Sequence, residues 1–129
     1  MERWRFFRAG VLYRSSNFDA LREFYEQTVG LHVYREYGPS EKLLGVVFFL
    51  GDGFLEIARA SRSSPSVTLW LQVRDVRVEE DRLRAAGVTV VKPVERMPWG
   101  LIESWVHDQE ANELHLVEVP DDHPIRRRY

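Results

Sequence analysis

The sequence predicts an α+β protein of two βαβββ modules, whose strands form a curled mixed sheet around a cleft. Three observations carry this prediction. Two amphipathic helical segments each end at a glycine, Gly30 and Gly87. Segments with the apolar alternation typical of strands flank each helical segment in the same order, one before it and three after it. The two halves match at an offset of about 58 residues, which indicates a repeated plan.

The first module is expected over about residues 8–60. A strand is expected at residues 10–14, and Asn17 is the expected N-cap of a helix over residues 18–29. Gly30 ends that helix because glycine readily adopts a left-handed conformation. Three further strands are expected at residues 31–37, 43–50 and 54–60.

Residues 61–66, SRSSPS, have the composition of a linker, and the second module follows over about residues 67–119. Asp75 is the expected N-cap of a helix over residues 76–87. The strands of this module are expected at residues 67–73, 88–94, 101–107 and 113–119. Residues 120–129 are expected to form a solvated tail, so the 129 residues make one domain.

Composition excludes several classes of function. The net charge of −2 does not favour nucleic acid, and there is no cysteine for a disulfide or a thiolate site. No segment is long and apolar enough to span a membrane, and the N-terminus lacks the apolar core of a signal peptide. A cytoplasmic protein without nucleic-acid or membrane partners is expected.

Side-chain alternation predicts which residues face the cleft. The residues of each strand that are apolar at every second position are expected beneath the helix, and their neighbours face the opposite way. The ligand-binding candidates on that basis, with one tryptophan from a turn, are Arg14, Glu56, Trp70, Gln72, Trp99, Glu113 and His115. An aromatic wall with a few polar groups is typical of a small-molecule site.

The chain resembles the vicinal oxygen chelate superfamily, which includes glyoxalase I, extradiol dioxygenases and the fosfomycin- and bleomycin-resistance proteins. The resemblance covers about residues 8–119 and rests on NFDALREFYEQTVGL and PWGLIESWVHDQEANELHLVE. In the second segment Pro98, Trp99, Gly100, Asp108 and Asn112 occupy motif positions. Two positions depart from the motif: Gln109 replaces a proline and Ala111 a glycine.

The resemblance implies four metal-ligand positions, which fall here on Gly10, Glu56, Thr68 and His115. Glycine has no side chain to offer, and a threonine hydroxyl is a poor ligand for a divalent transition metal. Two remaining ligands are fewer than the three that catalytic sites of this kind use. No cofactor is therefore expected, and if a divalent metal binds, Glu56 and His115 are its ligands.

The resemblance implies a small-molecule-binding protein similar to bleomycin-resistance proteins, and a homodimer. One alternative is a metal-dependent glyoxalase-type lyase or isomerase, or a dioxygenase, in which Glu56 and His115 are the catalytic candidates. Another is an accessory domain with a vestigial cleft. Glu56 has two other interpretations, an ion pair with Arg14 or a hydrogen bond to His115. In the second case His115 is a candidate general base.

Overall fold

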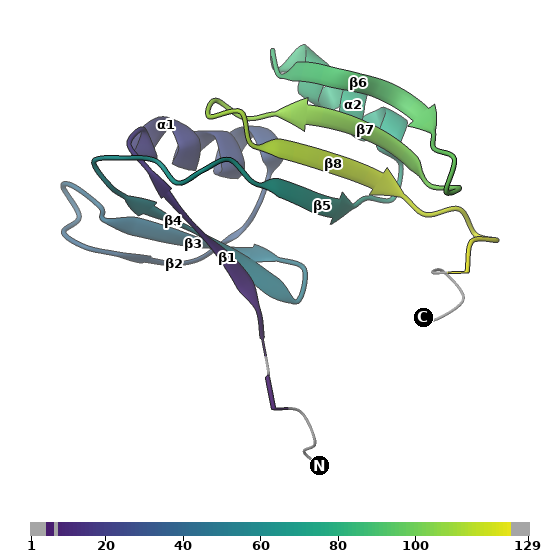
Figure 1. Cartoon of the computed structure of the whole chain (residues 1–129). Helices are drawn as coiled ribbons and strands as arrows, with labels where there is room; N and C mark the ends of the chain where they lie inside the picture. Colours follow the sequence, from purple (N-terminus) through teal and green to yellow (C-terminus); the bar gives the residue numbers. More distant parts are fainter. Residues whose placement is uncertain (1–4, 7, 125–129) are drawn as a thin grey trace. The chain divides into compact units, whose positions relative to one another are not determined.

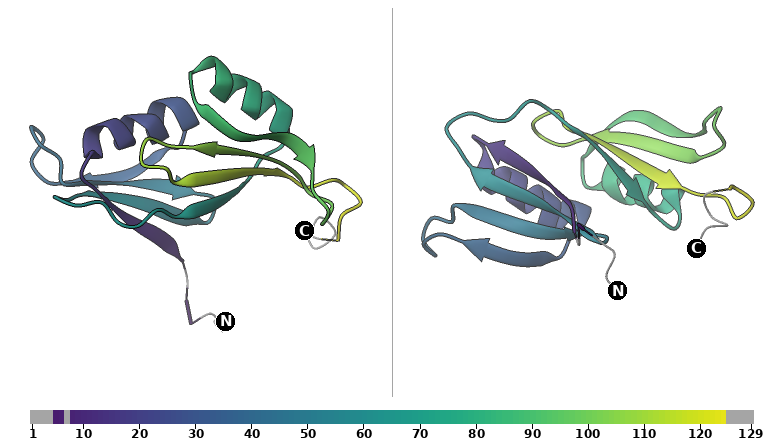
Figure 2. Two further views of the ribbon diagram at one scale, coloured as in Figure 1. Left: turned by 45° about the horizontal axis from the view of Figure 1, so that its top comes forward. Right: turned by 60° about the horizontal axis from the view of Figure 1, so that its bottom comes forward.

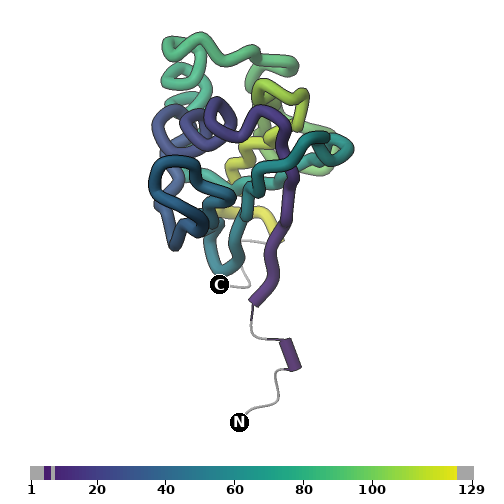
Figure 3. The backbone as a smooth tube through the Cα atoms, turned by 90° about the vertical axis from the view of Figure 1, so that its left-hand side faces the viewer, coloured from purple at the N-terminus to yellow at the C-terminus, as the bar shows by residue number. Residues whose placement is uncertain are grey.

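The computed structural model describes residues 5–6 and 8–124, and the chain divides into two compact units between Pro65 and Ser66. Figure 1 labels the helices and strands of both units, and Figure 3 traces the backbone from purple to yellow. The three arginines of the expected tail, residues 126–128, lie outside the described residues.

The first unit follows the predicted order of one strand, one helical segment and three strands. Its strands make one sheet in the order β1-β4-β3-β2, with β1 parallel to β4 and the other pairs antiparallel. The elements are β1 (Gly10–Ser15), α1 (Phe18–Glu23), η1 (Phe24–Val29), β2 (Val33–Tyr37), β3 (Gly45–Leu50) and β4 (Gly53–Arg59).

The second unit repeats this plan. The sheet order is β5-β8-β7-β6, and again the first strand of the unit runs parallel to its last strand. The elements are β5 (Thr68–Gln72), α2 (Val76–Ala85), β6 (Thr89–Arg96), β7 (Ile102–His107) and β8 (Glu113–Glu118). The predicted α+β class and the two βαβββ modules are thus confirmed, and within each unit the helix covers one face of its sheet (Figure 2).

The first helical segment differs from the prediction in two ways. Asn17 occupies the N-cap position of α1, but its side chain makes no capping hydrogen bond. The segment also changes after Glu23 into a π-helix, which ends at Gly30 in a left-handed conformation (φ 94°). The wider π turn lets the adjacent residues Phe24 and Tyr25 both enter the core, where their rings pack edge to face at 5.1 Å.

The second helix has the predicted cap. The Asp75 side chain accepts hydrogen bonds from the backbone N–H groups of Arg77 (3.1 Å) and Val78 (3.2 Å). The N–H of Val76 donates to Glu118 Oε1 of β8 at 3.0 Å. Two carboxylates therefore satisfy donors that the first turn of a helix leaves unpaired.

A buried carboxylate connects α2 to its sheet. Glu80 Oε2 accepts hydrogen bonds from the backbone N–H of Val94 (2.8 Å) and the Ser104 hydroxyl (2.7 Å). Val94 follows Pro93, where the β6–β7 register is irregular, so its N–H has left the ladder. Glu80 supplies the acceptor that the neighbouring strand does not.

The predicted alternation of the strands largely holds. Tyr13 is buried on the helix side of the first sheet, opposite Ile57. The other helix-facing strand residues that are buried include Leu55, Ile57, Leu69, Leu114 and Leu116. Val117, the register partner of Glu103 on the face opposite α2, is fully buried in a cluster with Leu101 and Val119.

The expected linker does not simply span the two units. Its serines hydrogen-bond to β1, since Ser64 exchanges two bonds with the backbone of Arg14 (2.9 and 2.8 Å) and Ser63 Oγ accepts from the N–H of Ser16 at 3.0 Å. These bonds occupy part of the edge of β1 that β4 does not use. No helix among the described residues has the length and apolar character needed to cross a bilayer.

Candidate functional site

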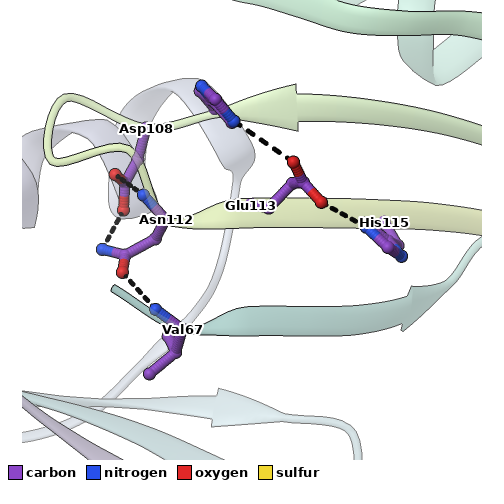
Figure 4. A network of polar contacts seen from close by, with 6 residues as sticks. Val67, Asp108, Asn112, Glu113 and His115 are labelled. Atoms are coloured by element: carbon purple, nitrogen blue, oxygen red, sulfur yellow. Dashed lines mark hydrogen bonds and ion pairs between the residues drawn. The ribbon is translucent and has the colours of Figure 1, made fainter. Parts of the chain in front are cut away.

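The turn between β7 and β8 fixes where the last strand begins. Asp108 Oδ1 accepts from the N–H groups of Glu110 (2.8 Å) and Asn112 (3.0 Å), and its Oδ2 accepts from the Asn112 amide at 2.8 Å. Asn112 Oδ1 in turn accepts from the N–H of Val67 at 2.8 Å, just before β5 (Figure 4). The turn thus sets the starting points of β5 and β8 together. Ala111, in place of the motif glycine, has a positive φ of 62°.

Glu113, the first residue of β8, lies between two histidines. Its Oε1 is 2.8 Å from His115 Nε2, and its Oε2 is 3.3 Å from His107 Nε2. Figure 4 shows the contact between Glu113 and His115 as a dashed line. The hydrogen bond from His115 is the main reason that the pKa of Glu113 lies below its usual value, and His107 adds to the effect. Glu113 is therefore ionised at neutral pH.

This arrangement defines the hydrogens of the two histidines. An ionised carboxylate only accepts hydrogen bonds, so the Nε2 atom of His115 and that of His107 each carry the donated hydrogen. In a neutral imidazole the other nitrogen, Nδ1, is then an acceptor. The pair of His115 and Glu113 resembles the base and orienting carboxylate of acid–base sites.

His115 also lies in a row of aromatic residues across three strands. It is the register partner of Trp70 on β5 and of Trp105 on β7, so all three occupy the face opposite α2. The rings of His115 and Trp105 are stacked, with centroids 4.0 Å apart and planes 2° from parallel. The Lys92 ammonium lies 5.5 Å from the Trp105 ring centroid. Trp70 is 50% exposed, which leaves much of its ring accessible.

A second carboxylate on this face receives two indole N–H groups. Trp105 Nε1 donates to Glu103 Oε1 at 2.8 Å, and Trp99 Nε1 donates to Glu103 Oε2 at 2.7 Å. Glu103 is only 2% exposed, whereas Trp99 is 54% exposed. Each carboxylate oxygen of Glu103 therefore orients one tryptophan.

In the first unit, Glu56 binds Tyr37. The Tyr37 hydroxyl donates to Glu56 Oε2 at 2.6 Å. The ring reaches across Gly45 of β3, where an added Cβ would lie 2.1 Å from Cζ of the tyrosine, so only glycine leaves room. Burial, followed by the hydrogen bond to Glu56, raises the pKa of Tyr37 to about 12. The hydroxyl therefore remains a donor throughout the physiological pH range.

The alternative partner of Glu56, Arg14, does not form the expected ion pair. In residues 8–124, where both side chains are placed, Glu56 pairs with Tyr37 instead. Arg14 is exposed on β1, and its charge slightly opposes the rise of the Tyr37 pKa. A tyrosine hydroxyl satisfies the carboxylate without a second buried charge.

The four positions implied for a metal do not suit one. At Gly10 an added Cβ would lie 2.5 Å from the Phe54 ring, so that ring fills the space of a ligand side chain. Glu56 is engaged by Tyr37, His115 by Glu113, and Thr68 offers only a hydroxyl. No group of three or more histidine or acidic side chains in the described part of the chain could hold a metal ion.

The predicted site residues thus fall into separate groups. The structure joins His115 to Glu113 directly, and it joins Trp99 to the same face through Glu103. Gln72 is exposed on β5, two residues beyond Trp70. Glu56 and Arg14 belong to the other unit. The prediction that Glu56 meets His115 stays a prediction.

Sequence reasoning missed the residues that hold this site in place. The alternation of side chains along residues 101–107 could have assigned Glu103, Trp105 and His107 to one face of β7. Their contacts with β8 depend on antiparallel register, which pairs Trp105 with His115 and which no single strand encodes. No comparable signal indicated Tyr37.

A separate hollow of about 340 Å³ lies between α1 and the loop after β2. Its walls are mainly polar and charged and include Asp19, Arg22, Lys42 and Arg59. Arg59 is already engaged by Asp19 at 3.0 Å and by the Leu43 carbonyl at 2.8 Å. The hollow shares no residue with the groups around His115, Glu103 and Glu56 described above.

Comparison with known proteins identifies the family. The sequence matches the Glyoxalase/Bleomycin resistance protein/Dioxygenase superfamily over residues 9–125. The chain belongs to this superfamily. None of the curated proteins matches it.

Several solved structures have the same fold. TioX from Micromonospora sp. ML1 is similar with a TM-score of 0.78 and 18% identity, over 88% of this chain and 98% of that one. TnmS3, an antibiotic binding protein from Streptomyces sp. CB03234, has a TM-score of 0.70 and 19% identity, and the match covers 93% of this chain and 99% of that one. Lactoylglutathione lyase from Agrobacterium tumefaciens has a TM-score of 0.69 and 19% identity, and the match covers 85% of this chain and 91% of that one. Proteins described as a binder and as an enzyme therefore share this fold.

Proposed function

We propose that this protein binds a small organic molecule without a catalytic metal, in the manner of the bleomycin-resistance proteins of its superfamily. The observation that carries the proposal is the open face of the second sheet. There the half-exposed ring of Trp70 lies one strand away from His115, which is stacked on Trp105. Accessible aromatic surface beside a few fixed polar groups is the usual composition of a small-molecule site.

The polar groups favour a ligand that donates hydrogen bonds or carries positive charge. Glu113 is ionised, and Nδ1 of a neutral His115 accepts. Gln72 adds an amide from β5, while Arg14, which lies in the first unit, stays a sequence prediction of a ligand contact. A planar ligand would stack on Trp70, because indole rings attract other π-systems and cations.

The residues at the implied ligand positions support a metal-free site. Phe54 covers Gly10, and Tyr37 occupies the carboxylate of Glu56. The description of TnmS3 as antibiotic binding also supports a binder. A cytoplasmic homodimer is part of the proposal, and light scattering of the purified protein measures the dimer directly.

The test is a titration of the intrinsic tryptophan fluorescence with metal-free bleomycin and a panel of planar aromatic natural products. We expect saturable quenching by at least one compound. Trp70→Ala should weaken that binding by about 10-fold or more, since a buried aromatic contact is worth at least about 1.4 kcal/mol. Val78→Ala, an exposed apolar residue of α2, is the control and should leave affinity unchanged.

Two results would count against the proposal. One is stoichiometric manganese, iron, nickel or zinc in protein purified without chelator, with the metal lost in Glu56→Gln; this result favours the metal-dependent lyase, isomerase or dioxygenase. The other is no quenching by any compound of the panel, which favours an accessory domain.

A further inference from the structure

We infer that Glu103 is a positioning residue of the aromatic face: it holds Trp105 against His115 and fixes Trp99 beside them, so the face is arranged before any ligand arrives. The link to ligand recognition rests on the proposed function above. The positioning itself does not, because it concerns contacts within β7, β8 and the turn that contains Trp99.

The burial of Glu103 is the first step of the argument. A carboxylate that is 2% exposed loses its hydration, and this loss is unfavourable unless protein donors replace the water. Lys92 on the neighbouring strand pairs with Glu95 at 3.3 Å, and its ammonium lies over the Trp105 ring. Within the described residues, no ion pair joins Glu103 to a basic side chain, and two indole N–H groups are its donors.

The geometry of the donors is the second step. An indole has a single N–H, which lies in the plane of the ring, so a fixed acceptor restrains the orientation of the whole side chain. Trp105 donates at 2.8 Å and is parallel to the His115 ring within 2°. The stack alone permits the indole to slide or turn, whereas the stack together with the hydrogen bond does not.

The third step is that His115 is restrained from two directions. Glu113 fixes its Nε2 at 2.8 Å, and Trp105 covers one face of its ring. Glu103 therefore acts on His115 through Trp105, while Glu113 acts on it directly. Two carboxylates on the same sheet face thus orient one histidine, by different routes.

The experiment measures ring positions in the free protein by NMR. The protein has four histidines, and we expect the ring protons of His115 to be shifted upfield from those of the other three by the adjacent indole. We also expect the indole N–H protons of Trp99 and Trp105 to exchange more slowly with solvent than that of Trp70.

Glu103→Gln keeps the size of the side chain but replaces one acceptor oxygen by a donor NH₂. The remaining oxygen can accept from only one indole, so the variant should speed exchange of the N–H of Trp99 or of Trp105, and loss of the Trp105 bond should reduce the upfield shift of His115. Glu79→Gln, which makes the same exchange on the exposed side of α2, is the matched control and should leave the His115 shift and the exchange of both indole N–H protons unchanged. Folded Glu103→Gln in which the His115 shift and the exchange of both indole N–H protons are all unchanged would overturn the inference.

Trp105→Phe provides a second variant should Glu103→Gln not fold. The phenyl ring has no N–H, so it should not be held parallel to His115, and the upfield shift should fall. A Trp105→Phe protein with the full shift would show that packing alone orients the ring. Glu103→Gln should also weaken binding of any compound that quenches the fluorescence by about 10-fold. If the NMR changes occur but binding is unaffected, the result counts against the proposed function and not against the positioning role of Glu103.

Discussion

The hydrogen bond between Tyr37 and Glu56 supports a quantitative prediction. Tyr37→Phe removes the hydroxyl but keeps the ring over Gly45. A hydrogen bond to a charged group contributes about 1.5–3 kcal/mol, and the partial exposure of this pair reduces the expected loss at pH 7 to about 1 kcal/mol. The matched control is Tyr34→Phe on the same strand, where the ring is half exposed and the loss should be near zero.

The pH dependence follows from the raised pKa. Because the pKa of Tyr37 rises from 10.0 to about 12, its contribution is fully present below pH 10 and is lost as pH rises towards 12. A pKa rise of this size corresponds to about 2.7 kcal/mol of stability, which the partial exposure of the pair lowers to about 1–2 kcal/mol. Tyr37→Phe should lack this part of the alkaline loss of stability.

Two measurements check the prediction. Urea unfolding at neutral and alkaline pH gives the free energies of unfolding. The difference in absorbance at high pH between wild type and Tyr37→Phe isolates the titration of one phenol among the five tyrosines. A midpoint near 10 in that difference, or equal losses of stability in Tyr37→Phe and Tyr34→Phe, would refute the reasoning.

Three further predictions concern stability and are checked by urea unfolding. Glu80→Ala should cost about 3 kcal/mol, because two donors lose their acceptor, while Glu79→Ala on the exposed side of α2 should cost under about 0.5 kcal/mol. Asp75→Ala should cost about 1 kcal/mol, but Asn17→Ala almost nothing, since only Asp75 caps with its side chain; equal costs would contradict this. Ala111→Gly should stabilise by about 0.5–1 kcal/mol by relieving a positive φ, and a loss would show that the turn is unstrained.

The elements of the fold were predictable because their signals are local. Gly30 and Asp75 specify a helix end and a helix start through their own backbone and side chain. The π-helix was not predictable, because it depends on how Phe24 and Tyr25 both reach the core. The capping failure of Asn17 likewise depends on backbone angles that the residue type does not reveal.

The candidate site was predictable only by face. Alternation placed Trp70 and His115 on the open side of their strands, and the structure agrees. The partners of His115 come from register between strands and from long side chains that cross it, as Trp105 and Glu113 do. Glu113 lies two residues before His115 on the same face of β8, and the reach of both side chains brings Oε1 and Nε2 to 2.8 Å.

The Phe54 ring over Gly10 has an evolutionary consequence. A mutation that introduced a histidine or glutamate at Gly10 would meet the aromatic ring before it offered a ligand, so the variant would be damaged before it gained chemistry. A ligand side chain at position 10 therefore requires Phe54 to move or to be replaced as well, so the chemistry open to position 10 depends on the residue at position 54.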